Sequence, residues 1–307
     1  MPVVKSPLPH RASLWKIITL QRMESASIGR TRAVLAEIRS ALPSLQPSDA
    51  RVATTVLQQP EAVIHWSVSD LAAAAGASTA TVVRCAQKLG FKGFHQLKLA
   101  LAQDLATFAP DEAPSTDPNE RALEQVIAAG AQTVRDAAAL VDRAAFRATV
   151  DALAAARRVL FCGVGTSAPL AQDAAYRFSV VGVDAQAPAD VHVQHVTARL
   201  LEPGDVCVAV SHSGATREIL AAVTAAAEAQ AMTVAITSYS RSPLTELAGL
   251  VLVAGSREVS FRLEAVASRL AHLALLDALL VAVADAVGDR ADDALRRYTD
   301  VIGEHRL

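Results

Sequence analysis

Aromatic residues and cysteine are scarce in this chain of 307 residues. Aromatic residues make up 4% of it, and the three cysteines (Cys85, Cys162 and Cys207) lie far apart without C-x-x-C spacing. An odd number of scattered cysteines supports neither a disulfide framework nor a cysteine-based zinc site, so no metal and no cofactor is expected. The chain is 52% hydrophobic and rich in alanine, which predicts helices packed through small residues.

Lysine is absent after Lys98, and this absence exposes an uneven distribution of charge. Residues 1–110 hold 12 basic and 6 acidic side chains, whereas the remainder is acidic enough to bring the whole chain to a net charge of −2. A basic front on an acidic body favours contact between the front and a polyanion.

A long uninterrupted apolar run is also missing. The longest such stretch, residues 265–287, is broken by Arg269, His272, Asp277 and Asp285, which favours a buried helix over a membrane span. The N-terminus has basic residues but no apolar core of the signal-peptide type. A cytoplasmic protein is expected.

Composition divides the chain into segments. Residues 1–29 lack clear periodicity and are expected to be a mobile extension, and Met23 is an alternative start. Residues 30–108 are helical, the proline-rich 109–119 are a linker, 120–290 form a second domain, and 291–307 a C-terminal tail.

The stretch from 67 to 101 has the pattern of a helix-turn-helix. Ser69 is expected to cap a short helix that ends at Gly76, and Ser78 caps a second helix that ends near Gly90. In the second helix, Val82, Ala86 and Leu89 form the apolar side, with Val83 at its margin. Four residues share the polar side, and Cys85 is assigned to that side too: Ser78, Thr81, Arg84 and Lys88. Arg84, Lys88 and Lys92 are then candidates to bind phosphate or guanine, the alternative being a solvated surface helix.

The sequence of the second domain predicts apolar strands that alternate with helices. Strands are expected near 159–163, 183–187, 205–210, 232–237 and 250–253. This pattern predicts an α/β domain, Rossmann-like, with a parallel sheet flanked by helices.

Two loops of this domain are expected to hold an anion. "GVGTS" (163–167) and "SHSGAT" (211–216) each follow a strand and open a helix, and both lie at carboxyl ends of strands. The first loop offers Gly165 and Thr166; in the second, Gly214 lets the backbone approach the ligand. Hydroxyls come from Ser167, Ser211, Ser213 and Thr216.

Catalytic and dinucleotide readings of these loops fit poorly. Ala168 stands where a dinucleotide fingerprint has its third glycine, and the G-x-S-x-G elbow of hydrolases is absent. His212 is adjacent to both serines along a strand end, which places it poorly for deprotonating either one.

These motifs together resemble a known family. "GVGTSA", "SHSGATREI" and "AITSYSRSPLTELAGLVL" resemble the sugar isomerase (SIS) phosphosugar-binding domain. "TATVVRCAQKLGFKGFHQLKLALAQDL" resembles the helix-turn-helix of the RpiR transcriptional regulators, and 261–279 the closing segment of their SIS domain.

The resemblance implies a cytoplasmic regulator that binds operator DNA and changes its affinity when a sugar phosphate binds. We expect a homodimer or homotetramer on a pseudo-palindromic operator, because two-fold symmetry in the protein is matched in the DNA. By motif position, Ser167, Ser211, Ser213 and Thr216 match the phosphate cradle. Residues matched to the sugar side are Thr166, Thr237, Ser238 and Glu264. The recognition helix and its exit turn correspond to Ser78, Thr79, Thr81, Arg84, Lys88 and Lys92.

Two features depart from the family pattern: the alanines of "LAAAAG" (71–76), where charged residues are usual, and the N-terminal extension. The rival function is a phosphosugar isomerase or related lyase that uses Glu264 with a histidine, for which His192, His195 and His212 are the candidates. The sugar, the operator and the sign of regulation stay open at this point.

Overall fold

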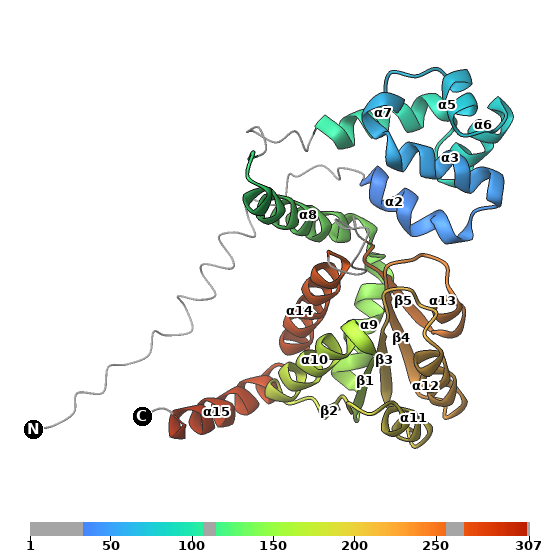
Figure 1. The fold of residues 1–307 in the computed structure, drawn as a ribbon. Coiled ribbons are helices and arrows are strands. Elements are labelled where there is room, and N and C mark those ends of the chain that lie inside the picture. The colour runs from blue at the N-terminus through green and yellow to red at the C-terminus, as the bar shows by residue number, and fades with distance from the viewer. Residues whose placement is uncertain (1–32, 107–114, 256–266, 306–307) are drawn as a thin grey trace, which may run out of the picture. The chain divides into compact units, whose positions relative to one another are not determined.

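The computed structural model describes residues 33–106, 115–255 and 267–305 (Figure 1). The helices of the first segment enclose a core of their own, in which Leu71, Val82, Leu97 and Leu101 are almost fully buried. Its elements are α2 (Val34–Ala41), η2 (Leu42–Ser44), α3 (Pro47–Gln58), α4 (Pro60–Val63), α5 (Val68–Ala74), α6 (Thr79–Lys88) and α7 (Phe94–Ala106).

Helices α5 and α6 form the predicted helix-turn-helix, with one correction at its start. Ser67, and not Ser69, is the N-cap of α5, because Asp70 stands three residues later and completes a capping box with Ser67. Gly76 has a φ of 55° at the turn, and Arg51 of α3 donates to the carbonyls of Ala75 and Gly76. The turn is therefore fixed by hydrogen bonds from a neighbouring helix.

The second segment is an α/β domain, as the alternating pattern predicts. Its five parallel strands lie in the order β2-β1-β3-β4-β5. The strands are β1 (Val159–Gly163), β2 (Ala185–Gln186), β3 (Val206–Val210), β4 (Met232–Thr237) and β5 (Leu250–Val253). The strand expected over 183–187 is thus reduced to two residues at the edge. The other elements are α8 (Pro118–Leu140), α9 (Arg143–Ala155), η3 (Gly165–Ser167), α10 (Ala168–Val180), α11 (Val191–Arg199), α12 (Arg217–Glu228), α13 (Pro243–Leu247), α14 (Ser268–Val287) and α15 (Asp289–Glu304).

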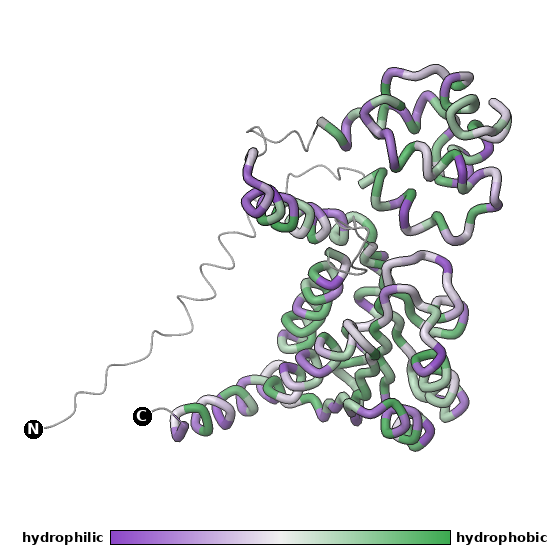
Figure 2. Tube along the Cα trace, in the orientation of Figure 1, coloured by the Kyte–Doolittle hydropathy of each residue, from purple (hydrophilic) through white to green (hydrophobic). Residues whose placement is uncertain are grey.

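Helices cover both faces of this sheet. One face packs against α9, α10 and α14 around Phe161 and Phe178, and the other against α11, α12 and α13 around Leu160 and Ile219. The central strands β1 and β3 are buried along their whole length, and Figure 2 shows them as continuously hydrophobic. Both cysteines of this domain, Cys162 and Cys207, lie in this interior.

Helix α14 is apolar on nearly all sides. Among the described residues it is the one helix long and apolar enough, by length and composition, to cross a membrane, and a third of its most apolar stretch is buried. It packs against α8, α9 and α10, yet Leu270 and Val281 remain exposed. The helix predicted here exists, but it is only partly buried.

Candidate functional site

The two glycine-containing loops meet at the carboxyl edge of the sheet. From β1 the chain passes to β2 on one side, whereas β3 pairs with β1 on the other side, so the loops flank a topological switch point. A cleft of about 270 Å³ opens between them. Its lining residues are Val164, Gly165, Thr166, Ser167, Val210, Ser211, His212, Ser213, Thr216 and Ile219.

The 211–216 loop is held in shape by a glycine at a positive φ and by two hydrogen bonds. Gly214 has a φ of 62°, in the left-handed region that favours glycine. Its N–H donates to Ser211 Oγ at 3.2 Å, and its carbonyl accepts from the N–H of Leu244 at 2.9 Å. These contacts fix the shape of the loop.

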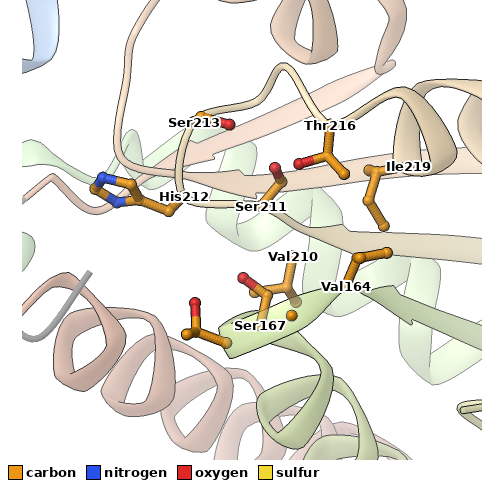
Figure 3. Close-up of a pocket in the computed structure, with 10 residues that line it drawn as sticks. Val164, Ser167, Val210, Ser211, His212, Ser213, Thr216 and Ile219 are labelled. Atoms are coloured by element: carbon orange, nitrogen blue, oxygen red, sulfur yellow. The ribbon is translucent and has the colours of Figure 1, made fainter. Parts of the chain in front are cut away.

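The cleft offers donors for an anion. Figure 3 shows the hydroxyls of Ser211 and Thr216 on the same side of the loop, with Ser167 facing them from the η3 side. Thr216 is the N-cap of the twelve-residue helix α12, and no side chain caps the helix amides there. Free amides and the positive end of the helix dipole favour an anion, and so do hydroxyl donors. Neither lysine nor arginine lines the cleft in the described part of the chain.

His212 is turned away from the serines beside it. Its Nδ1 lies 2.8 Å from Ser238 Oγ and 3.0 Å from Ser268 Oγ, and Figure 3 shows the ring pointing away from the Ser211 hydroxyl. Thr237 Oγ1 donates to the His212 carbonyl at 3.2 Å. Thr237 and Ser238 thus brace the loop from behind and do not line the cleft, so their contact with a sugar stays a prediction.

A buried histidine completes this polar cluster. His272 of α14 is 1% exposed, and its Nε2 lies 3.1 Å from Ser238 Oγ. Burial, with a smaller contribution from His212, lowers the pKa of His272 to about 3. The imidazole is therefore neutral at physiological pH, and it links the loop behind the cleft to α14 through Ser238.

The other predicted residues of this domain are placed as follows. Thr166 lines the cleft. His192 and His195 are exposed on α11 and are absent from the lining of the cleft. Glu264 lies outside the described residues, so its part in the site stays a prediction.

Helix α6 is positioned by its cap and its buried side. Ser78 Oγ accepts from the N–H of Thr81 at 3.1 Å, as its predicted role as N-cap requires. Thr81 is 7% exposed, and its hydroxyl hydrogen-bonds that of Ser78, so it stabilises the start of the helix. The assignment of Cys85 to the polar side is wrong: it is 1% exposed and packs in the core. Burial, followed by the nearby Asp49 carboxylate, raises the pKa of the Cys85 thiol to about 11.

Two basic residues of α6 are tied to a buried carboxylate that the sequence did not single out. Asp49 of α3 has a fully buried side chain; Arg84 Nη2 lies 3.1 Å from its Oδ1, and Lys88 Nζ lies 2.5 Å from its Oδ2. Burial raises the pKa of Asp49, but the hydrogen bonds from Lys88 and Arg84 outweigh it and leave that pKa below its ordinary value. Thr79 and Lys92 are exposed at the start of α6 and in its exit turn.

Comparison with known proteins identifies the family. The helix-turn-helix domain of the rpiR family matches residues 32–108, and the SIS domain matches residues 152–282. An HTH-type transcriptional regulator of Caldanaerobacter subterraneus subsp. tengcongensis is 36% identical over 272 residues, which cover 88% of this chain and 93% of the relative. The chain belongs to the rpiR family of transcriptional regulators.

Two further proteins are similar to this RpiR-family regulator over most of its length. The structure of the Vibrio vulnificus NanR protein complexed with ManNAc-6P is 27% identical, with a TM-score of 0.57, and the match covers 89% of this chain and 99% of that one. The bifunctional protein glk of Paraburkholderia xenovorans is 34% identical over 276 residues, which cover 87% of this chain but 42% of that protein. Most of the bifunctional protein therefore has no counterpart in the regulator.

Removing the Asp49 carboxylate is expected to loosen the helix-turn-helix. Asp49→Asn takes away the charge that both Arg84 and Lys88 contact, and these half-exposed cations then turn to water, so we expect a loss of about 1–3 kcal/mol. Hydrogen–deuterium exchange should show faster exchange in α3 and α6.

Asp151→Asn on the exposed side of α9 is the matched control, with an expected change within about 0.5 kcal/mol. Equal protection of α3 and α6 in the two variants would show that the Asp49 pairs contribute nothing to stability.

Proposed function

We propose that this regulator binds operator DNA through α6 and that a sugar phosphate in the cleft between the β1 and β3 loops changes its DNA affinity. The observation that carries the proposal is the hydroxyl-lined cleft at the uncapped start of α12. A phosphate there accepts hydrogen bonds from hydroxyl and amide donors, and Gly214 lets the backbone of its loop approach the phosphate. The residues that surround the phosphate are Gly165, Ser167, Ser211, Ser213 and Thr216. The NanR complex with ManNAc-6P supports a phosphorylated sugar as the ligand.

The effector acts through a difference in its affinity for two states of the protein. A ligand changes DNA affinity only to the extent that it binds one state more tightly, typically by about 1–3 kcal/mol. By linkage, operator DNA changes the affinity for the sugar phosphate by the same factor. This regulator is thus a reciprocal switch between a metabolite and DNA.

The regulator acts in the cytoplasm as a homo-oligomer. Its operator is pseudo-palindromic, because two-fold symmetry in the protein is mirrored by the DNA that it binds. Exposed apolar side chains on α8 and α14, among them Leu123, Ile127 and Val281, each more than 60% exposed, support self-association. Residues 30–108 form the DNA-binding domain, 109–119 the linker and 120–290 the effector domain, followed by a tail over 291–307. The predicted extension, residues 1–29, lies outside the described residues, as does the first part of the predicted linker, residues 109–114.

The cleft binds its sugar phosphate without turnover. Interconversion of an aldose and a ketose needs a base beside the carbonyl carbon and an acid to assist it. His212 is the one titratable side chain that lines the cleft in the described residues, and its Nδ1 is engaged with Ser238 and Ser268. Incubation of the protein with a panel of sugar phosphates tests this directly. Any isomerised product would show that the protein is an enzyme and would contradict the proposal.

Removing two hydroxyls from the cleft is expected to abolish the response of the regulator to sugar phosphate. Each hydrogen bond to a charged phosphate contributes about 1.5–3 kcal/mol, so Ser211→Ala with Ser213→Ala should weaken sugar-phosphate binding at least 100-fold. DNA binding without effector should be unchanged. Calorimetry with the panel gives the affinity for the sugar phosphate, and fluorescence anisotropy on the DNA upstream of its own gene gives the operator affinity.

Ser179→Ala on α10 is the control, since Ser179 Oγ bonds backbone carbonyls away from the cleft. An unchanged response of the double variant would place the phosphate elsewhere. If the unmodified regulator fails to bind any DNA fragment selectively, regulation itself is wrong.

A further inference from the structure

The side of α6 that faces away from the core is centred on uncharged residues, although the helix contains two basic ones. The buried side is set by Thr81, Val82, Cys85, Ala86 and Leu89, each less than 9% exposed. At about 100° per residue, the direction opposite to this side passes between two positions. The two positions are Ala80 and Gln87. Val83 lies about 50° from this outward direction on one side, and Arg84 about 50° from it on the other.

Arg84 is poorly prepared to read a base. Its Nε and Nη2 lie 3.3 Å and 3.1 Å from Asp49 Oδ1, so two of its three nitrogens are directed at α3. Guanine recognition needs a pair of free donors that reach O6 and N7 together. Lys88 Nζ is held by the other oxygen of the same carboxylate. These two cations are thus positioned to contact the phosphates of the DNA backbone. Such contacts fix the orientation of the protein on DNA and carry no sequence information.

The remaining outward side chains of α6 are exposed. Val83 is 37% exposed and is not part of the core that contains Val82. Gln87 is exposed, and its carboxamide makes no hydrogen bond to another residue in the described ranges. Exposed methyl groups and a free carboxamide match two features of the major groove: the thymine methyl group, and the N6/N7 edge of adenine, to which glutamine binds in a bidentate manner.

We propose that Ala80, Val83 and Gln87 are the residues by which α6 reads its operator, and that they select thymine and adenine within each half-site. This assignment rests on the proposed function, the binding of operator DNA. Arg84 and Lys88, fixed by Asp49, set the register of the helix on the backbone.

Selection from a randomised pool of double-stranded DNA with the full chain tests the assignment. The unmodified chain should enrich a motif with adenine at one position of each half-site. Gln87→Ala should lose the preference at that position and bind the selected site roughly 10- to 100-fold more weakly, with binding to random DNA changed less than about twofold. Gln87→Glu should shift the preference there towards cytosine, whose N4 amine donates to a carboxylate. Val83→Ala should weaken a thymine preference at a neighbouring position.

The control is Gln172→Ala on the exposed side of α10, which should leave the motif unchanged. Because Gln87 and Val83 are exposed, the variants should keep the helical circular dichroism and melting temperature of the unmodified chain. Motifs identical to the original for the Gln87 and Val83 variants would overturn the assignment while leaving operator binding intact. Absence of any enriched motif for the unmodified chain would overturn operator binding, and the assignment with it.

Discussion

Gly214→Ala is expected to abolish the response to sugar phosphate while leaving operator binding in place. Alanine at a φ of 62° costs roughly 1–2 kcal/mol in backbone strain. The added Cβ would also overlap the Ser242 hydroxyl and lie 2.7 Å from Ser242 Cβ. Ser242 cannot simply turn aside, because it caps α13 through a capping box with Thr245. The loop itself must move, and we expect sugar-phosphate affinity to fall more than 100-fold, measured by calorimetry.

A glycine that does not line the cleft provides the control for an alanine at a positive φ. Gly288 has a φ of 57°, but nothing lies within 4 Å of the position of its Cβ. Gly288→Ala also places alanine at a positive φ, but at the start of α15 and outside the lining of the cleft, so its effector affinity should match that of the unmodified regulator. Equal loss of affinity in both variants would show that the packing of Gly214 against Ser242 is not what shapes the cleft.

Acid is expected to destabilise the regulator through His272. Its pKa of about 3 in the folded chain lies below the value of about 6.5 in an unfolded chain, so between these pH values the unfolded state binds the proton. Stability from the neutral imidazole is complete above pH 6.5 and is lost as the pH falls, by about 1.4 kcal/mol per pH unit, or ~2 kcal/mol at pH 5. Urea unfolding from pH 7.5 to 4.5 measures this loss.

A glutamine at this position removes the titration. His272→Gln should be less stable at neutral pH, because the bond to Ser238 is altered, but its stability should depend much less on pH between 6.5 and 4.5. His195→Gln, on the exposed side of α11, should keep the pH dependence of the unmodified chain. A curve for His272→Gln as steep as the original would assign the acid sensitivity to another group.

Local patterns in the sequence predicted the architecture well. The strands near 205–210, 232–237 and 250–253, the turn at Gly76 and the cap at Ser78 each depend on a few neighbouring residues, and the structure has all of them. The two loops that line the cleft follow from the same kind of local pattern, since a strand, a glycine and a helix start are adjacent in the chain, whereas their binding of an anion stays a prediction.

Features that depend on tertiary packing were missed. The pairing of Asp49 with Arg84 and Lys88 joins residues 35 and 39 positions apart, and no local pattern announces it. The polar side of α6 is narrower than predicted: Thr81 and Cys85 are buried, and the Cys85 thiol contacts the Asp49 carbonyl of α3, whereas Val83 is exposed. His272 sits within an apolar run that carries no sign of its contact with Ser238.

Helix α6 keeps two kinds of residue on opposite sides. Val82, Ala86 and Leu89 hold it in the core, and the outward Ala80 and Gln87 take no part in that packing. Surface substitutions of this kind usually alter stability by less than about 0.5 kcal/mol. Under the proposed assignment, changes at the outward positions of α6 alone would give one copy of a duplicated gene a new operator, while the fold and the cleft between the β1 and β3 loops remain as inherited.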